Sequence, residues 1–297
     1  MSEAEEVRAK RWENTKLSLS VFFANKAAVV GLVIVMIYVV IAVIDQVYPQ
    51  LIGITSVGTL VPNFFSPAPS PPSLAHLFGT TYPGVDLFTS IIKAIRIDLA
   101  YSVLVVAIGA AVGAIIGVIS ATVGGLMDEI VMRITDIFFS IPYLVLALAV
   151  GFILGRTLLN MSLALALVWW PLYARYTRSQ TLSTKEFTFI EAAKASGVGR
   201  LKIMFKHILP NTLPPVFIQI SLDVGSIMVI FSMLAFIGFI TNASIPELGY
   251  LTSLGLSYVQ TAPWAVIFPG VAITLFALAV NLMGDGLRDV IDPRRRS

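Results

Sequence analysis

The amino-acid sequence predicts an all-α integral membrane protein with six transmembrane helices. Of its 297 residues, 57% are hydrophobic and only 12% are charged, whereas a soluble domain carries roughly 25% charged residues. Six windows are long enough and poor enough in charge to cross a bilayer, which needs about 20 apolar residues per helix. Lys and Arg are also concentrated in alternate connections between these windows. Together these observations place the chain among multi-pass membrane proteins.

The predicted spans follow the windows in chain order. Five of them contain no Asp, Glu, Lys or Arg, and the fifth in sequence is interrupted only by Asp223. The windows cover residues 27–44, 99–127, 137–155, 157–174, 214–239 and 262–283. Gly109, Gly113 and Gly117 recur every four residues in the second window, a pattern that lets two helix backbones pack closely in lipid.

The distribution of Lys and Arg predicts which side each connection faces. Seventeen of the 20 lie before the first span, between spans two and three, between spans four and five, or in the tail. The alternate connections hold only Lys93, Arg96 and Arg156. Because basic loops stay in the cytoplasm, both termini are predicted to be cytoplasmic and the chain to lie in the cell (plasma or inner) membrane.

This topology divides the chain into five segments. Residues 1–26 are expected to form a cytoplasmic interfacial segment, with 5–23 as an amphipathic helix or an irregular tail. Residues 27–47 form the first transmembrane helix and 48–97 an external loop, where several prolines favour an extended path. Residues 98–290 form a five-helix core domain, and 291–297 a basic cytoplasmic tail.

The cytoplasmic loop at residues 181–210 has an unusual pattern. Residues 189–196 are helical in character, Gly197 and Gly199 interrupt them, and apolar residues then return at helical spacing until Pro210. The expected structure is two short helices meeting at a bend, with Pro210 closing the unit. An apolar surface rimmed by Lys and Arg is typical of a docking site for another protein.

Composition excludes several other activities. The chain has no cysteine and only two histidines, in unrelated places, so neither catalytic residues nor metal ligands are predicted and an intramembrane enzyme is disfavoured. A net charge of +3 gives no indication of a nucleic-acid partner. No GxxxxGK[ST] phosphate-binding loop occurs anywhere in the sequence, so the chain is not expected to bind or hydrolyse ATP.

The 181–210 loop resembles the EAA loop of ABC importer permeases. Glu191-Ala192-Ala193, Gly197 and Leu209-Pro210 carry the likeness, and the string 207–211 (His-Ile-Leu-Pro-Asn) resembles the dipeptide/oligopeptide branch. The stretches 262–264 and 281–289 also resemble this branch. In the family, the loop docks in a groove of the ATPase subunit. The resemblance therefore implies that a set of residues contacts the ATPase: Glu191, Ala192, Ala193, Gly197, Leu201, Met204, Phe205, His207, Leu209 and Pro210.

The resemblance also implies a fold and a set of partners. The fold is that of type I ABC importer permeases, with six transmembrane helices and cytoplasmic coupling helices. The partners are a similar but not identical sister permease, two ATP-binding subunits, an extracytoplasmic substrate-binding protein and the lipid bilayer. ATP and Mg would be bound by the ATPase subunits, with no cofactor on this chain. Movement of the coupling helices would pass through spans four and five and rock the two permeases.

Substrate and transport class have alternatives at this stage. Peptides are the first expectation from the resemblance, with di- or oligosaccharides and nickel as alternatives. An ATP-independent secondary transporter is a different class, which would predict two related halves, and the sequence has no such repeat. Asp223 is a candidate to line the translocation path, because ionisable residues within a membrane are rare and usually functional. The alternative is that it only bonds to a neighbouring helix.

Overall fold

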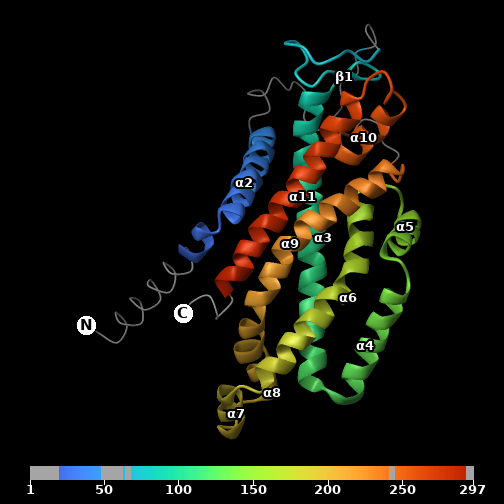
Figure 1. Cartoon of the computed structure of the whole chain (residues 1–297). Coiled ribbons are helices and arrows are strands. Elements are labelled where there is room, and N and C mark those ends of the chain that lie inside the picture. Colours follow the sequence, from blue (N-terminus) through green and yellow to red (C-terminus); the bar gives the residue numbers. More distant parts are fainter. Residues whose placement is uncertain (1–19, 48–62, 64–67, 241–244, 292–297) are drawn as a thin grey trace.

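A computed structural model of the chain describes residues 20–47, 63, 68–240 and 245–291, most of which are helical (Figure 1). The predictions for 1–19, for 48–62 and for the tail after 291 lie outside the described residues. The elements in chain order are α2 (Lys26–Val47), β1 (Thr80–Thr81), β2 (Val85–Asp86), α3 (Leu87–Val123), α4 (Gly125–Ser140), α5 (Tyr143–Leu154), α6 (Leu158–Lys185), α7 (Thr188–Ala195), α8 (Arg200–Lys202), the π-helix η2 (Ile203–Ile208), α9 (Leu209–Phe236), α10 (Leu248–Leu256) and α11 (Trp264–Ile291).

The helices form a bundle whose members alternate in direction (Figure 1). By length and composition, four helices of the described residues suit a membrane: α2, α3, α11, and α9 together with the two elements before it. α4 and α5, which are bent by 93° at their junction, make a fifth span if the pair is one crossing. α6 has 28 residues and corresponds to the fourth predicted span, but its polar C-terminal half keeps composition alone from identifying it as a crossing. The small antiparallel pair β1–β2 and α10 lie at one end of the bundle, and α7 and α8 at the other.

The third predicted span is broken, where the sequence windows predicted one helix over 137–155. α4 ends at Ser140 and α5 begins at Tyr143, with Ile141 extended at φ −103° and ψ 131°. The ring of Pro142 clashes with a helical conformation of the residue before it, so Ile141 leaves the helix. The bend therefore follows from local sequence, and it divides the span into two halves that point in different directions.

α3 begins twelve residues earlier than the charge-free window predicted. Asp86 caps the helix, its Oδ1 accepting a hydrogen bond from the Thr89 amide at 2.9 Å. Arg96 lies in the first part of the helix and pairs with the fully buried Asp45 of α2, with 2.7 Å between Nε and Oδ2. The predicted external loop 48–97 thus ends at Asp86. The search for charge-free windows missed these turns because they contain Lys93, Arg96 and Asp98, which lie within the helix bundle.

The glycine pattern in α3 packs that helix against α6, as predicted. A Cβ atom on Gly113 would lie 2.3 Å from the backbone oxygen of Trp170, and one on Gly117 would lie 2.4 Å from that of Ala174. Real Cβ atoms do not approach backbone atoms so closely, so only glycine fits at these two positions. The close contact fixes α3 and α6 as the central pair of the bundle.

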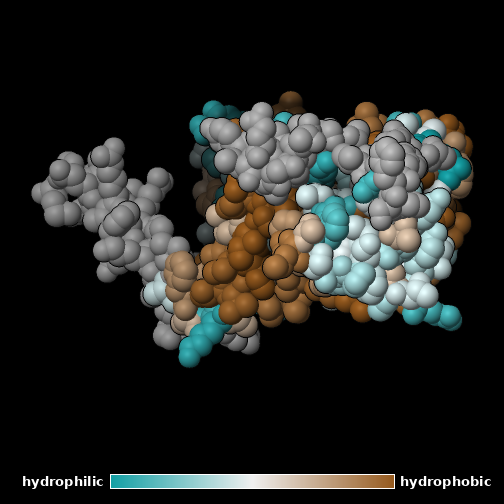
Figure 2. Space-filling view, turned by 90° about the horizontal axis from the view of Figure 1, so that it is seen from above, coloured by the Kyte–Doolittle hydropathy of each residue, from teal (hydrophilic) through white to brown (hydrophobic). Residues whose placement is uncertain are grey.

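Two hydrophobic clusters hold the bundle together. The larger joins α3, α5, α6 and α9 around fully buried residues such as Leu165, Ile227 and Phe231. The second joins α2, α10 and α11 to the first turns of α3. α2 has the smallest buried share of the four apolar helices, and its exposed residues include Val33, Ile37 and Val40. Figure 2, seen from above, shows a hydrophobic area beside a paler, more polar area.

Candidate functional site

The EAA loop forms two helical segments that meet at Gly197. α7 ends at Ala195, and Gly197 takes the left-handed conformation with φ +75°. Its amide donates to the Lys194 carbonyl at 3.0 Å, and the next amide, of Val198, donates to the Ala193 carbonyl at 3.1 Å. This pattern ends a helix and reverses the chain, and it favours glycine because a side chain is strained at such a φ. The predicted bend at Gly197 is confirmed.

The second segment does not end at Pro210, which corrects the prediction that this proline closes the unit. Residues from Arg200 to Phe236 form one helical run of 37 residues. Within it, η2 is a π-helical turn, and the Leu209 amide donates to the Met204 carbonyl five residues earlier. Pro210 follows directly in the first turn of α9, a position where a proline, which has no N–H, is tolerated in a helix. The loop is therefore mechanically continuous with a membrane-spanning helix.

The apolar residues of the loop divide into a buried support and an exposed surface. Ile190, Ile203, Met204 and Ile208 are buried together with Val118 of α3. Met204 is only 5% exposed and packs with Val118 of α3, so it supports the loop from within, and its predicted role in coupling to the ATPase stays a prediction.

Leu201 and Phe205 have the opposite environment, at 71% and 51% exposed. Phe187 and Phe189 at the start of α7, which the sequence analysis did not single out, are also exposed. Their position in the sequence, beside the helical part of the loop, was the signal that could have identified them as part of the exposed surface. Of the other predicted contact residues, Glu191, Ala192, Gly197 and Pro210 are exposed, whereas Ala193, His207 and Leu209 are half-buried.

Both halves of the broken span pack on α6, and polar contacts fix each half at a different place. In α4, Asp128 accepts two hydrogen bonds from Arg178 of α6, at 2.7 Å from Nε and 2.6 Å from Nη2. Further along α4, Asp136 pairs with Arg175 of α6. Just after α5, Arg156 Nε donates to the Phe239 carbonyl beyond α9 at 2.9 Å. α4 is therefore held to α6, while the end of α5 is held to the segment that follows α9.

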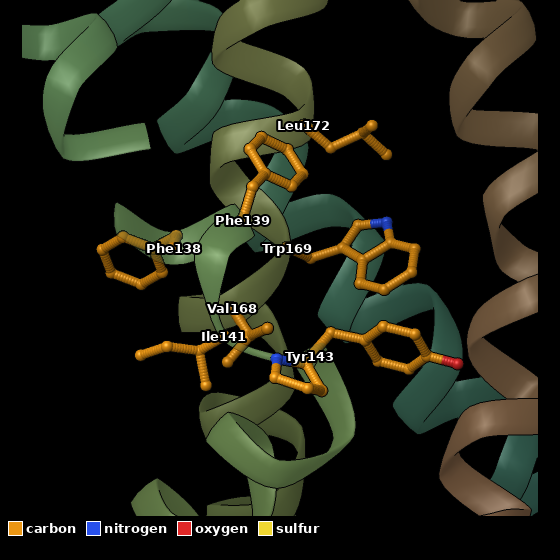
Figure 3. Close-up of a pocket in the computed structure, with 8 residues that line it drawn as sticks. Phe138, Phe139, Ile141, Tyr143, Val168, Trp169 and Leu172 are labelled. Carbon is orange, nitrogen blue, oxygen red and sulfur yellow. The ribbon is translucent and has the colours of Figure 1, made fainter. Parts of the chain in front are cut away.

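An apolar cavity of about 220 Å³ lies at the break in this span (Figure 3). Its walls come from the end of α4, the start of α5 and the facing part of α6, and consist of Phe138, Phe139, Ile141, Pro142, Tyr143, Val168, Trp169 and Leu172. The rings of Tyr143 and Trp169 meet edge to face, 6.0 Å apart. Figure 3 shows both rings projecting to the same side of the break.

Asp223 lies next to this cavity, behind Trp169. Its Oδ2 accepts a hydrogen bond from Trp169 Nε1 at 3.1 Å, and its Oδ1 accepts one from Gln219 Nε2 at 2.9 Å. The residue is only 4% exposed. The structure thus places Asp223 between α6 and α9, and it does not bring this residue near the EAA loop.

A second buried carboxyl group, which the sequence analysis did not single out, lies at the opposite end from the EAA loop. Glu247 caps α10, its Oε2 accepting from the Tyr250 amide at 2.6 Å, and the neighbouring Leu248 amide donates to Asp98 of α3 at 3.1 Å. Both acids are fully buried. Burial raises the pKa of Glu247 from 4.5 to about 7.

This raised pKa predicts that stability decreases with pH. Glu247 binds a proton more tightly in the folded protein, so its contribution is complete below pH 4.5 and is lost as the pH rises to about 7. The loss should reach about 3 kcal/mol in unfolding free energy. Thermal unfolding in detergent from pH 5 to 8 should show a falling Tm that Glu247→Gln flattens. Glu191→Gln, at an exposed position, is the control, and an equal slope in all three proteins would contradict the prediction.

Comparison with known proteins is consistent with this architecture. Residues 113–297 match the family described as binding-protein-dependent transport system inner membrane component. The probable D,D-dipeptide transport system permease protein DdpC of Escherichia coli (strain K12) is 42% identical over 224 residues, 75% of this chain and 75% of that protein. The dipeptide transport system permease protein DppC of Alkalihalophilus pseudofirmus is 37% identical over 273 residues, 92% of this chain and 88% of that protein.

A solved structure shares the fold. A chain of the MetNI methionine ABC transporter, solved in inward-facing conformations, aligns with a TM-score of 0.55 at 20% identity, covering 69% of this chain and 98% of that one. The bundle and these likenesses define a multi-pass inner-membrane permease subunit of an ABC importer with the type I fold. The chain belongs to the family of binding-protein-dependent transport system inner membrane components. The family resemblance inferred from the sequence is therefore confirmed.

Proposed function

We propose that this chain forms half of the translocation path of an ATP-driven importer for dipeptides. Both relatives named above are described as dipeptide permeases, which favours peptides over oligosaccharides or nickel. The partners would be a sister permease, two ATP-binding subunits and an extracytoplasmic binding protein that delivers the peptide. ATP hydrolysis would occur on the ATP-binding subunits.

The observation that carries this proposal is the continuous helix from the EAA loop into the bundle. Leu201 and Phe205 are exposed on its first turns, and buried residues of the same turns pack against α3. An ATPase subunit that binds the exposed residues would displace a helical run of 37 residues, which extends to the far end of α9. Because α7 packs on the same support, the two helical segments would move as one coupling unit.

This mechanism requires α7 and α8 to face the cytoplasm, and the distribution of Lys and Arg supports that orientation. The start of α2 lies against the end of α11, since Asn25 Nδ2 donates to Asp289 at 3.2 Å. These ends lie toward the same side of the bundle as α7 and α8 (Figure 1). We assign this side to the cytoplasm because the basic connections lie there. The β1–β2 pair and α10 would then face the binding protein.

The proposal is tested by uptake in liposomes that contain the complete complex. ATP is sealed inside, and the binding protein with radiolabelled alanyl-phenylalanine is added outside. Accumulation is expected only with hydrolysable ATP, and a non-hydrolysable analogue is the control. Uptake at the same rate without ATP would contradict the proposal and favour a secondary transporter. Accumulation of an oligosaccharide or nickel in place of the dipeptide would overturn the proposed substrate.

A further inference from the structure

Asp223 lies within a predicted membrane span, and its carboxylate accepts hydrogen bonds from neutral donors. The indole N–H of Trp169 and the amide of Gln219 supply one hydrogen bond to each oxygen. Among the described residues, the carboxylates of Asp45, Asp128 and Asp136 pair with Arg side chains. Asp98 and Glu247 resemble Asp223 in having uncharged donors, but they lie at the end of the bundle that carries α10. No ion pair to Asp223 is found in this described part. A buried carboxylate without a cation is costly to keep in a membrane protein and is usually kept for a function.

Trp169 connects this carboxylate to the cavity at the broken span. One side of its indole ring forms part of the cavity wall, and its N–H is bonded to Asp223. The Tyr143 ring, half-exposed, packs against Trp169 on the cavity side (Figure 3). A rotation of the Trp169 side chain would therefore open Asp223 to a molecule in the cavity. No other residue of the cavity wall bonds to Asp223 in the described structure.

The cavity and the carboxylate together fit the chemistry of a peptide's N-terminal end. The cavity is apolar, and at about 220 Å³ it is smaller than pockets that hold whole drug-sized ligands. It suits one apolar side chain. An ammonium group beside that side chain would supply the cation that Asp223 lacks. The amide of Gln219 would remain as the second partner of the carboxylate.

We propose that Asp223 binds the α-ammonium group of the transported peptide, with Trp169 covering the carboxylate until the peptide arrives. This inference rests on the proposed dipeptide import and deepens it by naming the group that the path recognises. Peptides with a free N-terminus are the substrate class. Because Trp169 belongs to α6 and Asp223 to α9, a movement of α9 relative to α6 would change the Trp169–Asp223 contact at the cavity wall.

The test compares variants in the liposome assay with alanyl-phenylalanine. Asp223→Asn should lower the uptake rate roughly thirtyfold, because one partner of a buried charge pair is lost. Asp223→Glu should restore most of the uptake. ATP hydrolysis stimulated by the binding protein should persist in Asp223→Asn, since that variant leaves the EAA loop intact. Ser221→Ala is the matched control on α9, because its hydroxyl bonds only its own helix, at the Phe217 carbonyl.

A second variant separates a ligand role from a structural one. Trp169→Phe keeps a ring in the cavity wall and removes only the hydrogen bond, so under the proposal uptake is maintained. If Asp223 merely fastens α9 to α6, Trp169→Phe and Asp223→Asn should lose uptake and thermal stability equally, and that result would overturn the inference. Unchanged uptake in Asp223→Asn would also overturn it. Absence of dipeptide uptake by the wild-type complex would instead refute the proposed function itself.

Discussion

Replacing Gly197 with valine is expected to lower the ATP hydrolysis that the binding protein stimulates, while leaving the chain inserted in the membrane. Gly197 joins α7 to the following helix with φ +75°. A β-branched residue is strongly disfavoured at this φ, and forcing it there costs about 1–3 kcal/mol. The strain is relieved by moving α7 relative to α8, which disturbs the surface offered to the ATPase. ATP hydrolysis stimulated by the binding protein should fall by roughly tenfold or more.

Gly199 provides a matched control two residues away. A Cβ atom at either glycine would meet nothing within 4 Å, so neither substitution creates a clash. Gly199 has φ −60° and ψ 147°, a conformation open to any residue. Gly199→Val should therefore retain stimulated ATP hydrolysis. If the two variants behave alike, the left-handed bend is not what positions the coupling unit.

Replacing Phe205 with aspartate is expected to release the ATPase subunits from the permease. Phe205 is 51% exposed and stands beside the still more exposed Leu201, one turn before it on the same helix. Large apolar anchors of this kind carry most of the binding energy of an interface, at about 2 kcal/mol or more each. Burying an aspartate against an apolar groove adds a desolvation penalty. Affinity for the ATPase subunits should fall by roughly thirtyfold or more.

The control for Phe205→Asp is a substitution of the same kind at the other end of the molecule. Leu74 is 99% exposed and precedes β1 by six residues. Leu74→Asp should leave ATPase binding unchanged. Phe205→Leu should keep most of the affinity because it retains an apolar side chain. Full ATPase binding by Phe205→Asp would show that the partner contacts a different part of the loop.

Features with a local cause could be predicted from the sequence. The spans follow from runs of apolar residues, a close helix contact along α3 from glycines four residues apart, and the bend from Gly197. In each case the residues that create the feature lie within a few turns of one another. The helix break at Pro142 also has a local cause. The search for charge-free windows did not detect this break because proline carries no charge.

Features that depend on distant residues could not be predicted in this way. Arg96 is placed inside a helix by Asp45, fifty-one residues earlier, so a rule based on charge placed it in a loop. Met204 and Phe205 are neighbours in sequence and equally apolar, yet only the position of α3 decides which is buried. Trp169 and Asp223 come together only when α6 packs on α9.

The central claim is that this chain couples a membrane path to separate ATPase subunits through the EAA loop. The most direct test is to purify the tagged chain in mild detergent and identify the proteins that accompany it by mass spectrometry. The account predicts that a second permease and ATP-binding subunits copurify with the wild-type chain and with Leu74→Asp. It also predicts that Phe205→Asp retains the second permease and loses the ATP-binding subunits. A wild-type chain that purifies alone and still transports dipeptide without ATP would contradict it.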